Sequence, residues 1–208
     1  MNSEKKIKVF DDVFDYQMRE YVYNLAKNSN FKIGWEDTPI IEHREKVFIH
    51  SRWKYEHGEF INNGFIPSIK NRELFELIGG RQPSSIVLNC TLQNDVYLPH
   101  THIDQDVLLY YINMEWKREW YGETQFFSEN LNEIIFTNPY VPGRMVWFDG
   151  TIPHTIKTQS SSAPKYRFSV SLFFEKLNNK LNTVRSTEKK ERLIKFDGKD
   201  IKIKPDAD

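Results

Sequence analysis

The feature that most constrains the fold is a change in sequence texture at Ser85. After this residue, short runs rich in β-branched and aromatic residues alternate with turn residues, which is typical of a sandwich or barrel. We predict strands at Ser85–Gln93, Asp106–Met114, Thr124–Phe127, Glu133–Thr137, Gly143–Phe148 and Tyr166–Phe174. The second half of the chain is therefore expected to be β structure.

The part before Ser85 carries helical signals. Asp11 or Asp12 is expected to cap a helix that runs to about Asn28, after a short strand at Lys6–Phe10. The apolar residues of this helix recur at helical spacing, at Val13, Tyr16, Tyr21 and Leu25. A second helix is predicted at Ser68–Ile78, closed by Gly79-Gly80, and strand-like pieces lie at Phe31–Trp35 and Val47–Trp53.

Composition excludes several classes of protein. The 208 residues are 39% hydrophobic and 28% charged, which indicates one globular domain as the default. No run approaches the roughly 18 apolar residues of a membrane span. The net charge is zero, so a nucleic-acid partner is not expected. Cys90 is the single cysteine and no secretory leader is visible, so we expect no disulfides and a cytoplasmic setting.

One histidine motif carries candidate metal chemistry. His102-Ile103-Asp104 follows Tyr97-Leu98-Pro99, where a strand is predicted to begin, and residues i and i+2 of a strand share a face about 6.7 Å apart. An imidazole and a carboxylate can then converge on one ion. Iron(II) oxygenases need two histidines and one carboxylate, and His154, after the strand Gly143–Phe148, supplies the second histidine. The alternative is a hydrogen-bonded structural pair, because a lone His-x-Asp is a weak signal. His100 is expected at the surface of the strand mouth, with a supporting or substrate role as the alternative.

The strand Tyr166–Phe174 has two different faces. Its even positions are all apolar, whereas its odd positions begin with Arg167, Ser169 and Ser171. This polar face is either solvated or lines a barrel interior that holds a carboxylate ligand, for which the planar arginine fork is suited.

The order His102-x-Asp104, His154, Arg167-x-Ser169 resembles the iron(II)/2-oxoglutarate-dependent oxygenase superfamily, and more closely its prolyl 4-hydroxylase-like branch. Leu109-Tyr110-Tyr111-Ile112-Asn113-Met114-Glu115-Trp116 is similar to the branch's Tyr-Tyr-Leu-Asn-x-x-Trp strand, and Tyr121-Gly122-Glu123-Thr124-Gln125-Phe126 to its Gly-Gly-Glu-Thr-x-Phe segment. Pro142-Gly143-Arg144-Met145-Val146-Trp147-Phe148 and the strand Lys165 to Phe174 also match. The likeness spans residues 85–176, under half of the chain.

The resemblance implies an α+β, mainly β fold, a double-stranded β-helix (jelly-roll) with supporting N-terminal helices. His102, Asp104 and His154 would then bind Fe(II). Arg167 and Tyr111 would bind the distal carboxylate of 2-oxoglutarate, with Thr124 and Ser169 as further candidates. The implied activity is hydroxylation of a substrate by O₂, coupled to conversion of 2-oxoglutarate to succinate and CO₂, with ascorbate as a candidate reductant.

The sequence departs from the pattern of the branch in three places, and alternatives remain for the substrate and the function. The interval from Asp104 to Tyr111 is short, the interval from His154 to Arg167 is long, and Tyr121 stands where the branch has its first glycine. Peptidyl proline is the first substrate expected, and a free amino acid or another small molecule is the alternative. A non-catalytic metal-binding jelly-roll that acts as a sensor or interaction module, or a cupin-type enzyme with another metal, also remains open.

The oxygenase domain is expected to span residues 1–176, with support from 1–84 and the jelly-roll core in 85–176. Residues 177–208 form a polar tail with nine Lys and Arg against six Asp and Glu. Phe196-Asp197-Gly198-Lys199 is a candidate hairpin turn in this tail. The sequence indicates neither the oligomeric state nor a partner for the tail.

Overall fold

The computed structural model describes residues 7–33, 49–52, 58, 60–93, 95–176, 192–196 and 199–203. The chain separates into two compact units, Met1–Glu175 and Lys176–Asp208, and each is described by itself. Within the described residues, no helix is both long enough and apolar enough to cross a membrane.

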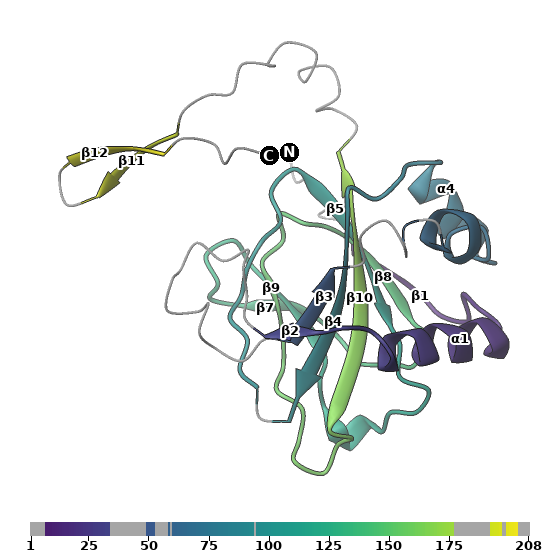
Figure 1. Ribbon diagram of the computed structural model, residues 1–208. Coiled ribbons are helices and arrows are strands. Elements are labelled where there is room, and N and C mark those ends of the chain that lie inside the picture. Colours follow the sequence, from purple (N-terminus) through teal and green to yellow (C-terminus); the bar gives the residue numbers. More distant parts are fainter. Residues whose placement is uncertain are drawn as a thin grey trace. The chain divides into compact units, whose positions relative to one another are not determined.

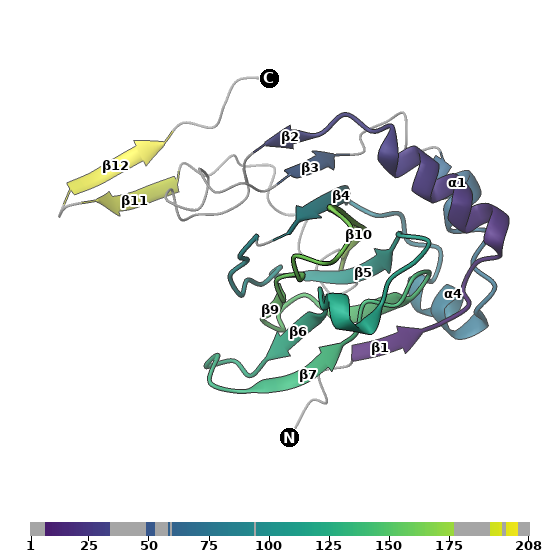
Figure 2. The same cartoon turned by 90° about the horizontal axis from the view of Figure 1, so that it is seen from below.

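The first unit contains two antiparallel sheets (Figures 1 and 2). The larger sheet has the strand order β1-β8-β5-β10-β4-β3-β2, and the smaller has the order β7-β6-β9. The strands of the larger sheet are β1 (Ile7–Phe10), β2 (Lys32–Ile33), β3 (Ile49–Arg52), β4 (Ser85–Leu92), β5 (Gln105–Tyr111), β8 (Met145–Asp149) and β10 (Tyr166–Glu175). Those of the smaller sheet are β6 (Thr124–Phe127), β7 (Ile134–Asn138) and β9 (His154–Ile156). The predicted mainly-β jelly-roll with supporting helices is confirmed.

Helices cover one face of the larger sheet, as Figure 2 shows. They are α1 (Tyr16–Lys27) and α4 (Arg72–Ile78), with a π-helical turn at Ile61–Phe65 and a 3-10 turn at Arg118–Trp120 elsewhere in the unit. Leu108 and Tyr110 of β5 join the apolar core on the helical side together with Val22 and Leu74. The neighbouring positions on β5 belong to a second core, because successive residues of a strand point to opposite faces.

The second core lies between the two sheets. Leu109 and Tyr111 of β5, Phe126 of β6 and Phe148 of β8 are all buried in it. Strands β4 and β10 have eight and ten residues. They are therefore long enough to contribute apolar residues to this core and polar residues next to it. The space between the sheets is therefore where a buried site can be built.

Helix α1 begins later than the sequence predicted. Asp15, not Asp11 or Asp12, caps it, and the Asp15 carboxylate accepts the Met18 N–H at 2.9 Å. Asp12 has a φ of 54° and so forms a left-handed turn between β1 and the helix. The helix buries Val22 and Ala26, whereas Tyr16 and Tyr21, which were expected on its apolar face, are 64% and 54% exposed.

Helix α4 is shorter than predicted but ends as predicted. Asn71 caps its start by accepting the Leu74 N–H, and Gly79 ends it in the left-handed conformation at φ 59°. The sequence reasoning missed β9, which at three residues is too short to show a period, and the π-helical turn. Trp35, Val47 and Trp53, the ends of two predicted strand pieces, lie outside the described residues.

In the second unit, β11 (Arg192–Phe196) and β12 (Lys199–Ile203) pair as an antiparallel hairpin. The two residues between these strands, 197 and 198, lie outside the described part.

Candidate metal and anion site

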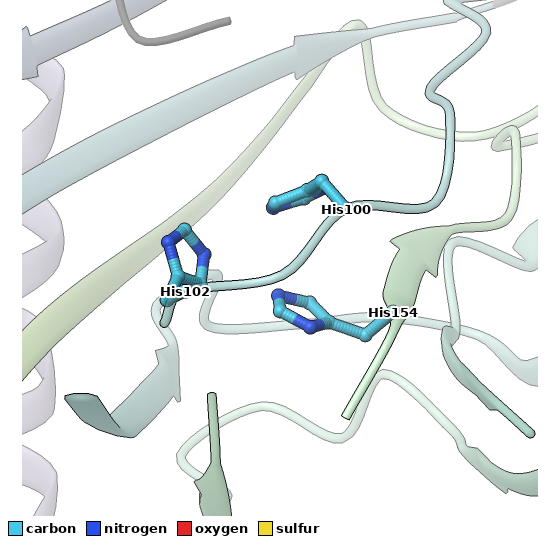
Figure 3. A group of neighbouring side chains, drawn as sticks. All are labelled: His100, His102 and His154. Carbon is cyan, nitrogen blue, oxygen red and sulfur yellow. The ribbon is translucent and has the colours of Figure 1, made fainter. Parts of the chain in front are cut away.

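Three histidines converge between the two sheets. One ring nitrogen from each of His100, His102 and His154 lies within 4.8 Å of the other two. The ring centroids are 4.5 Å apart for His100 and His154, 5.0 Å for His100 and His102, and 5.2 Å for His102 and His154. Figure 3 shows the three rings around one space. Of the residues that the structure describes, these are the ones that group as candidate metal ligands.

Backbone hydrogen bonds hold the three histidines in place. His100 and His154 exchange two of them, with the N–H of each donating to the carbonyl of the other at 3.1 and 3.0 Å. The His102 N–H donates to the Gly150 carbonyl at 2.7 Å. A Cβ at Gly150 would collide with the carbonyl oxygens of His102 and Gln105, so this close approach requires glycine.

Each imidazole of the cluster is neutral at physiological pH. Burial lowers the pKa of His102 to about 3, with the nearby His100 as a second cause. Burial also lowers the pKa of His100, and it holds the pKa of His154 well below its ordinary value. Neutral imidazole is the form that binds a metal ion, so the cluster is prepared to accept one without first releasing protons.

Carbonyl contacts set the tautomers of two of these rings. Nδ1 of His154 lies 2.9 Å from the Ile152 carbonyl, and Nδ1 of His100 lies 3.2 Å from the Leu98 carbonyl. A carbonyl oxygen only accepts hydrogen bonds, so in both rings Nδ1 carries the proton and Nε2 holds the lone pair. This arrangement is common for histidines that ligate metals, because the second contact fixes the orientation of the ring.

Asp104 does not join the histidine group. The structure contradicts the expectation that it shares a strand face with His102, because β5 starts only at Gln105. Asp104 instead occupies a turn with a φ of 64°, a conformation that aspartate tolerates better than most residues, and it is exposed. His100, expected at the surface of the strand mouth, is only partly exposed, and its ring packs against the other two histidines.

A buried arginine lies in the same interior. Arg167 of β10 is 0% exposed, and Phe168 on its other side packs in the helical core, so the polar face of this strand points inward and is not solvated. Its Nε donates to the Gly122 carbonyl at 3.0 Å, and its guanidinium carbon lies 4.4 Å from the centre of the Tyr140 ring. Both terminal nitrogens, Nη1 and Nη2, are buried and have no hydrogen-bond partner. The Ser169 hydroxyl is likewise buried without a partner.

A buried guanidinium with two unpaired nitrogens favours binding of an anion. Burial lowers the pKa of Arg167, yet a guanidinium stays charged in proteins because its ordinary pKa is so high. A buried charge without a partner is destabilising by several kcal/mol. A carboxylate that accepts from Nη1 and Nη2 together would satisfy both nitrogens.

A chain of hydrogen bonds orients the Tyr111 hydroxyl beside this arginine. Arg144, held by two contacts to Asp11, donates to the Asn138 side-chain oxygen at 3.2 Å. The Asn138 amide nitrogen therefore faces Tyr111 and donates to its hydroxyl oxygen at 2.9 Å. Tyr111 and Thr124 are 2.7 Å apart, so the Tyr111 proton is available to Thr124 or to a bound anion, but not to Asn138.

Strand β6 runs past His154 and continues to Thr124, which contacts Tyr111. Phe126 of this strand pairs with His154, and Thr124, two residues earlier, pairs with Ile156. Both Thr124 and Phe126 are buried, so they face the same interior about 6.7 Å apart along the strand.

Most of the predicted residues lie in this interior. His102 and His154 lie in the cluster, and Arg167, Tyr111, Thr124 and Ser169 are all buried, although their roles remain predictions. Sequence reasoning gave His100 a supporting or substrate role only as an alternative, and it did not single out Gly122, Asn138 or Tyr140 for the site. The spacing His100-x-His102 was the signal available for His100, whereas Asn138 and Tyr140 belong to no motif and are brought to the site only by the fold.

Comparison with known proteins indicates the fold. No family model matches the sequence. No curated protein matches it either. A prolyl-4-hydroxylase from Pseudomonas putida is similar in structure, with a TM-score of 0.60 and 12% identity over 84% of this chain and 95% of that one. A prolyl hydroxylase from Trichoplax adhaerens, solved with a hypoxia inducible factor peptide fragment, has a TM-score of 0.57 and 14% identity over 88% and 89%.

A 2OG-Fe(II) oxygenase family oxidoreductase from Burkholderia pseudomallei is also similar, with a TM-score of 0.60 and 12% identity over 81% of this chain and 85% of that one. The chain therefore has the fold of the 2OG-Fe(II) oxygenases, and this fold is prolyl 4-hydroxylase-like. At identities this low, the likeness concerns the fold alone.

Proposed function

We propose that this protein is an Fe(II)- and 2-oxoglutarate-dependent dioxygenase that hydroxylates its substrate. The observation that carries this proposal is the buried guanidinium of Arg167, whose Nη1 and Nη2 have no hydrogen-bond partner, in the same interior as three neutral histidines. One group calls for a carboxylate and the other for a divalent metal. A metal-chelating dicarboxylate meets both requirements.

The residues divide the work of binding and orientation. The histidine cluster would hold Fe(II), which when bound supplies the activation of O₂. Arg167 would donate from Nη1 and Nη2 to one carboxylate of 2-oxoglutarate, and Tyr111 or Thr124 would donate a further hydrogen bond to it. The overall reaction converts the substrate C–H, O₂ and 2-oxoglutarate into the alcohol, succinate and CO₂.

The apolar walls of the site would keep water from the reacting atoms. Phe173 lies 4.7 Å from the His102 ring, and Phe148 lies 4.7 Å from the His154 ring, both measured between ring centroids. Excluding water strengthens the electrostatic contacts inside a site and limits side reactions.

For the substrate we propose a proline in a peptide, because one of the structural relatives was solved with a peptide fragment. A small molecule such as a free amino acid is the alternative, since another relative is a carbocyclase from nogalamycin biosynthesis. The proposed cytoplasmic setting rests on the sequence alone.

Substrate-stimulated turnover tests this proposal. The full-length protein is incubated with Fe(II), 2-oxoglutarate, O₂ and ascorbate, with either a library of proline-containing peptides or a set of free amino acids. We expect peptides to raise succinate formation and to gain one oxygen atom by mass spectrometry. The Arg167→Met variant should show little of either at the same 2-oxoglutarate concentration.

Two other outcomes would change the proposal. Stimulation by free amino acids alone would move the substrate class to small molecules. Absence of succinate formation with every compound in both sets would favour a non-catalytic metal-binding module.

A further inference from the structure

We propose that the metal of this site is held by three imidazoles, those of His100, His102 and His154, and that Asp104 stays outside its coordination. This inference rests on the proposed function in that a divalent metal binds here. It differs from the arrangement of two histidines and one carboxylate that the sequence resemblance implies.

The positions of the ring nitrogens support three histidine ligands. Bonds of about 2.1 Å to one ion place neighbouring ligand atoms about 3–4 Å apart. The three candidate nitrogens already lie within 4.8 Å of one another, so small rotations of the rings bring them to this separation. The exchanged backbone hydrogen bonds between His100 and His154 place His100 in the cluster as firmly as His154.

The backbone keeps Asp104 on the outside. The His102 N–H donates to the Gly150 carbonyl, and the Gly150 N–H donates to the Gln105 carbonyl at 2.9 Å. Gly150 is thus hydrogen-bonded to both ends of the segment from His102 to Gln105. Ile103 and Asp104 form the turn between these ends, and Ile103 is 75% exposed. Asp104 has a left-handed φ of 64° in this turn and is exposed.

The ligand set decides the charge of the site. Three neutral imidazoles leave the full charge of +2 on a divalent ion, whereas a carboxylate in place of one imidazole would leave +1. With Arg167 nearby, the more positive site favours a doubly negative cosubstrate such as 2-oxoglutarate.

Titration of the metal-free, full-length protein with Co(II) alone tests the ligand set, because binding is read without turnover. We expect His100→Ala, His102→Ala and His154→Ala each to weaken Co(II) binding by about 100-fold or more, beyond the effect of losing a supporting residue. Asp104→Ala is the matched variant and should bind Co(II) within about twofold of wild type. Thermal unfolding of the metal-free variants checks that each one folds.

Proton NMR of the Co(II) complex counts the imidazoles directly. Each ligating histidine with a protonated second ring nitrogen gives one exchangeable signal shifted by the paramagnetic ion. We expect three such signals in wild type and three in Asp104→Ala.

The opposite pattern would overturn the inference. Two signals, with a large loss of Co(II) binding in Asp104→Ala and little loss in His100→Ala, would assign the carboxylate as the ligand. In that case metal-dependent binding of 2-oxoglutarate would persist and the proposed function would stand. Absence of any Co(II) binding in folded wild-type protein would instead contradict both.

Discussion

At the scale of the residue, the position of Arg167 depends on the absence of a side chain at Gly122. A Cβ there would lie 3.1 Å from both Cδ and Nε of Arg167 and 3.3 Å from Trp116. The Gly122 carbonyl also accepts the Nε hydrogen bond, and its φ is +79°. The glycine therefore allows the backbone to approach the arginine closely enough to fix it.

We predict that Gly122→Ala displaces Arg167 and weakens 2-oxoglutarate binding to the Fe(II)-loaded protein about 10-fold or more, because a charged hydrogen-bonded contact contributes about 1.5–3 kcal/mol. Gly80→Ala is the matched control, since Gly80 has a similar φ of +70° but open space where a Cβ would lie. Both variants should lose about 1 kcal/mol of stability through backbone strain. Equal affinities for 2-oxoglutarate in the two variants would contradict this role of Gly122.

Cys90 is predicted to be unreactive in the folded protein. It is 3% exposed on β4, and burial, with a smaller effect of the Asp95 charge, raises the pKa of its thiol to about 12. The reactive thiolate is therefore scarce at pH 8. We expect a thiol reagent at pH 8 to label Cys90 only after denaturation, and rapid labelling of the native protein would show that β4 opens or that the burial is wrong.

The residues of the site differ in how far their positions can be predicted from the sequence. The alternation of β10 separated an apolar from a polar face but left open whether Arg167 faces solvent or the interior, and only the family resemblance favoured the interior, where the structure places it. The position of Asp104 in a turn before β5 could not be foreseen, because it depends on a positive φ that a His-x-Asp motif does not reveal. Asn138 reaches Tyr111 only because β6 and β7 pair, and no local pattern encodes that contact.

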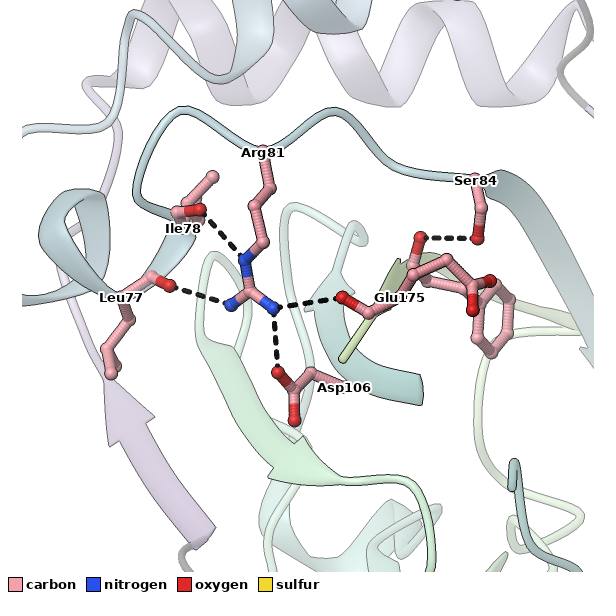
Figure 4. Close-up of polar contacts among 7 residues, drawn as sticks. Leu77, Ile78, Arg81, Ser84, Asp106 and Glu175 are labelled. Atoms are coloured by element: carbon pink, nitrogen blue, oxygen red, sulfur yellow. Dashed lines mark hydrogen bonds and ion pairs between the residues drawn. The ribbon is translucent and has the colours of Figure 1, made fainter. Parts of the chain in front are cut away.

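At the scale of the element, Arg81 connects helix α4 to the larger sheet through hydrogen bonds and an ion pair (Figure 4). Arg81 donates to the Leu77 and Ile78 carbonyls at the end of α4, at 2.8 and 3.1 Å. It also pairs with Asp106 of β5 at 2.9 Å and reaches the Glu175 carbonyl at the end of β10. The Arg81 and Asp106 side chains are only 14% and 22% exposed, so water screens this pair weakly.

We predict that Arg81→Leu lowers the free energy of unfolding by about 2–3 kcal/mol, because it leaves the α4 carbonyls and Asp106 without their partner. Arg72→Leu is the control, since Arg72 pairs with Glu76 on the exposed side of the same helix at 91% exposure. Denaturant unfolding should show no measurable loss for this control. Equal losses of unfolding free energy in the two variants would mean that the Arg81 contacts do not stabilise α4 against the sheet.

The elements themselves were largely predictable. Every strand expected after Ser85 exists, because alternation and turn residues mark both faces and both ends. The start of α1 was misplaced because three aspartates, Asp11, Asp12 and Asp15, could each cap a helix. Tertiary contacts make the choice: Asp11 is bound by Arg144, and Asp12 forms the turn.

At the scale of the whole first unit, the two sheets play different parts. The larger sheet is covered by helices on one face and carries Arg167 and Tyr111 on the other, whereas the smaller sheet contributes His154 and Thr124. The site therefore forms only when both sheets are in place. Solved structures with the same fold are 9–14% identical to this chain, so the same arrangement of sheets forms from largely different residues.

The central claim is that the metal and the buried arginine bind one dicarboxylate together. The most direct test is anaerobic calorimetric titration of 2-oxoglutarate into the full-length protein, with and without Fe(II). Arg167→Met removes the guanidinium, and Lys165→Met removes an exposed charge two residues away as the control. We predict binding in the micromolar range, about −8 kcal/mol, that requires Fe(II), is weakened about 100-fold in Arg167→Met and is unchanged in Lys165→Met. Binding that is indifferent to Fe(II) or to Arg167, or no binding at millimolar 2-oxoglutarate, would contradict the claim.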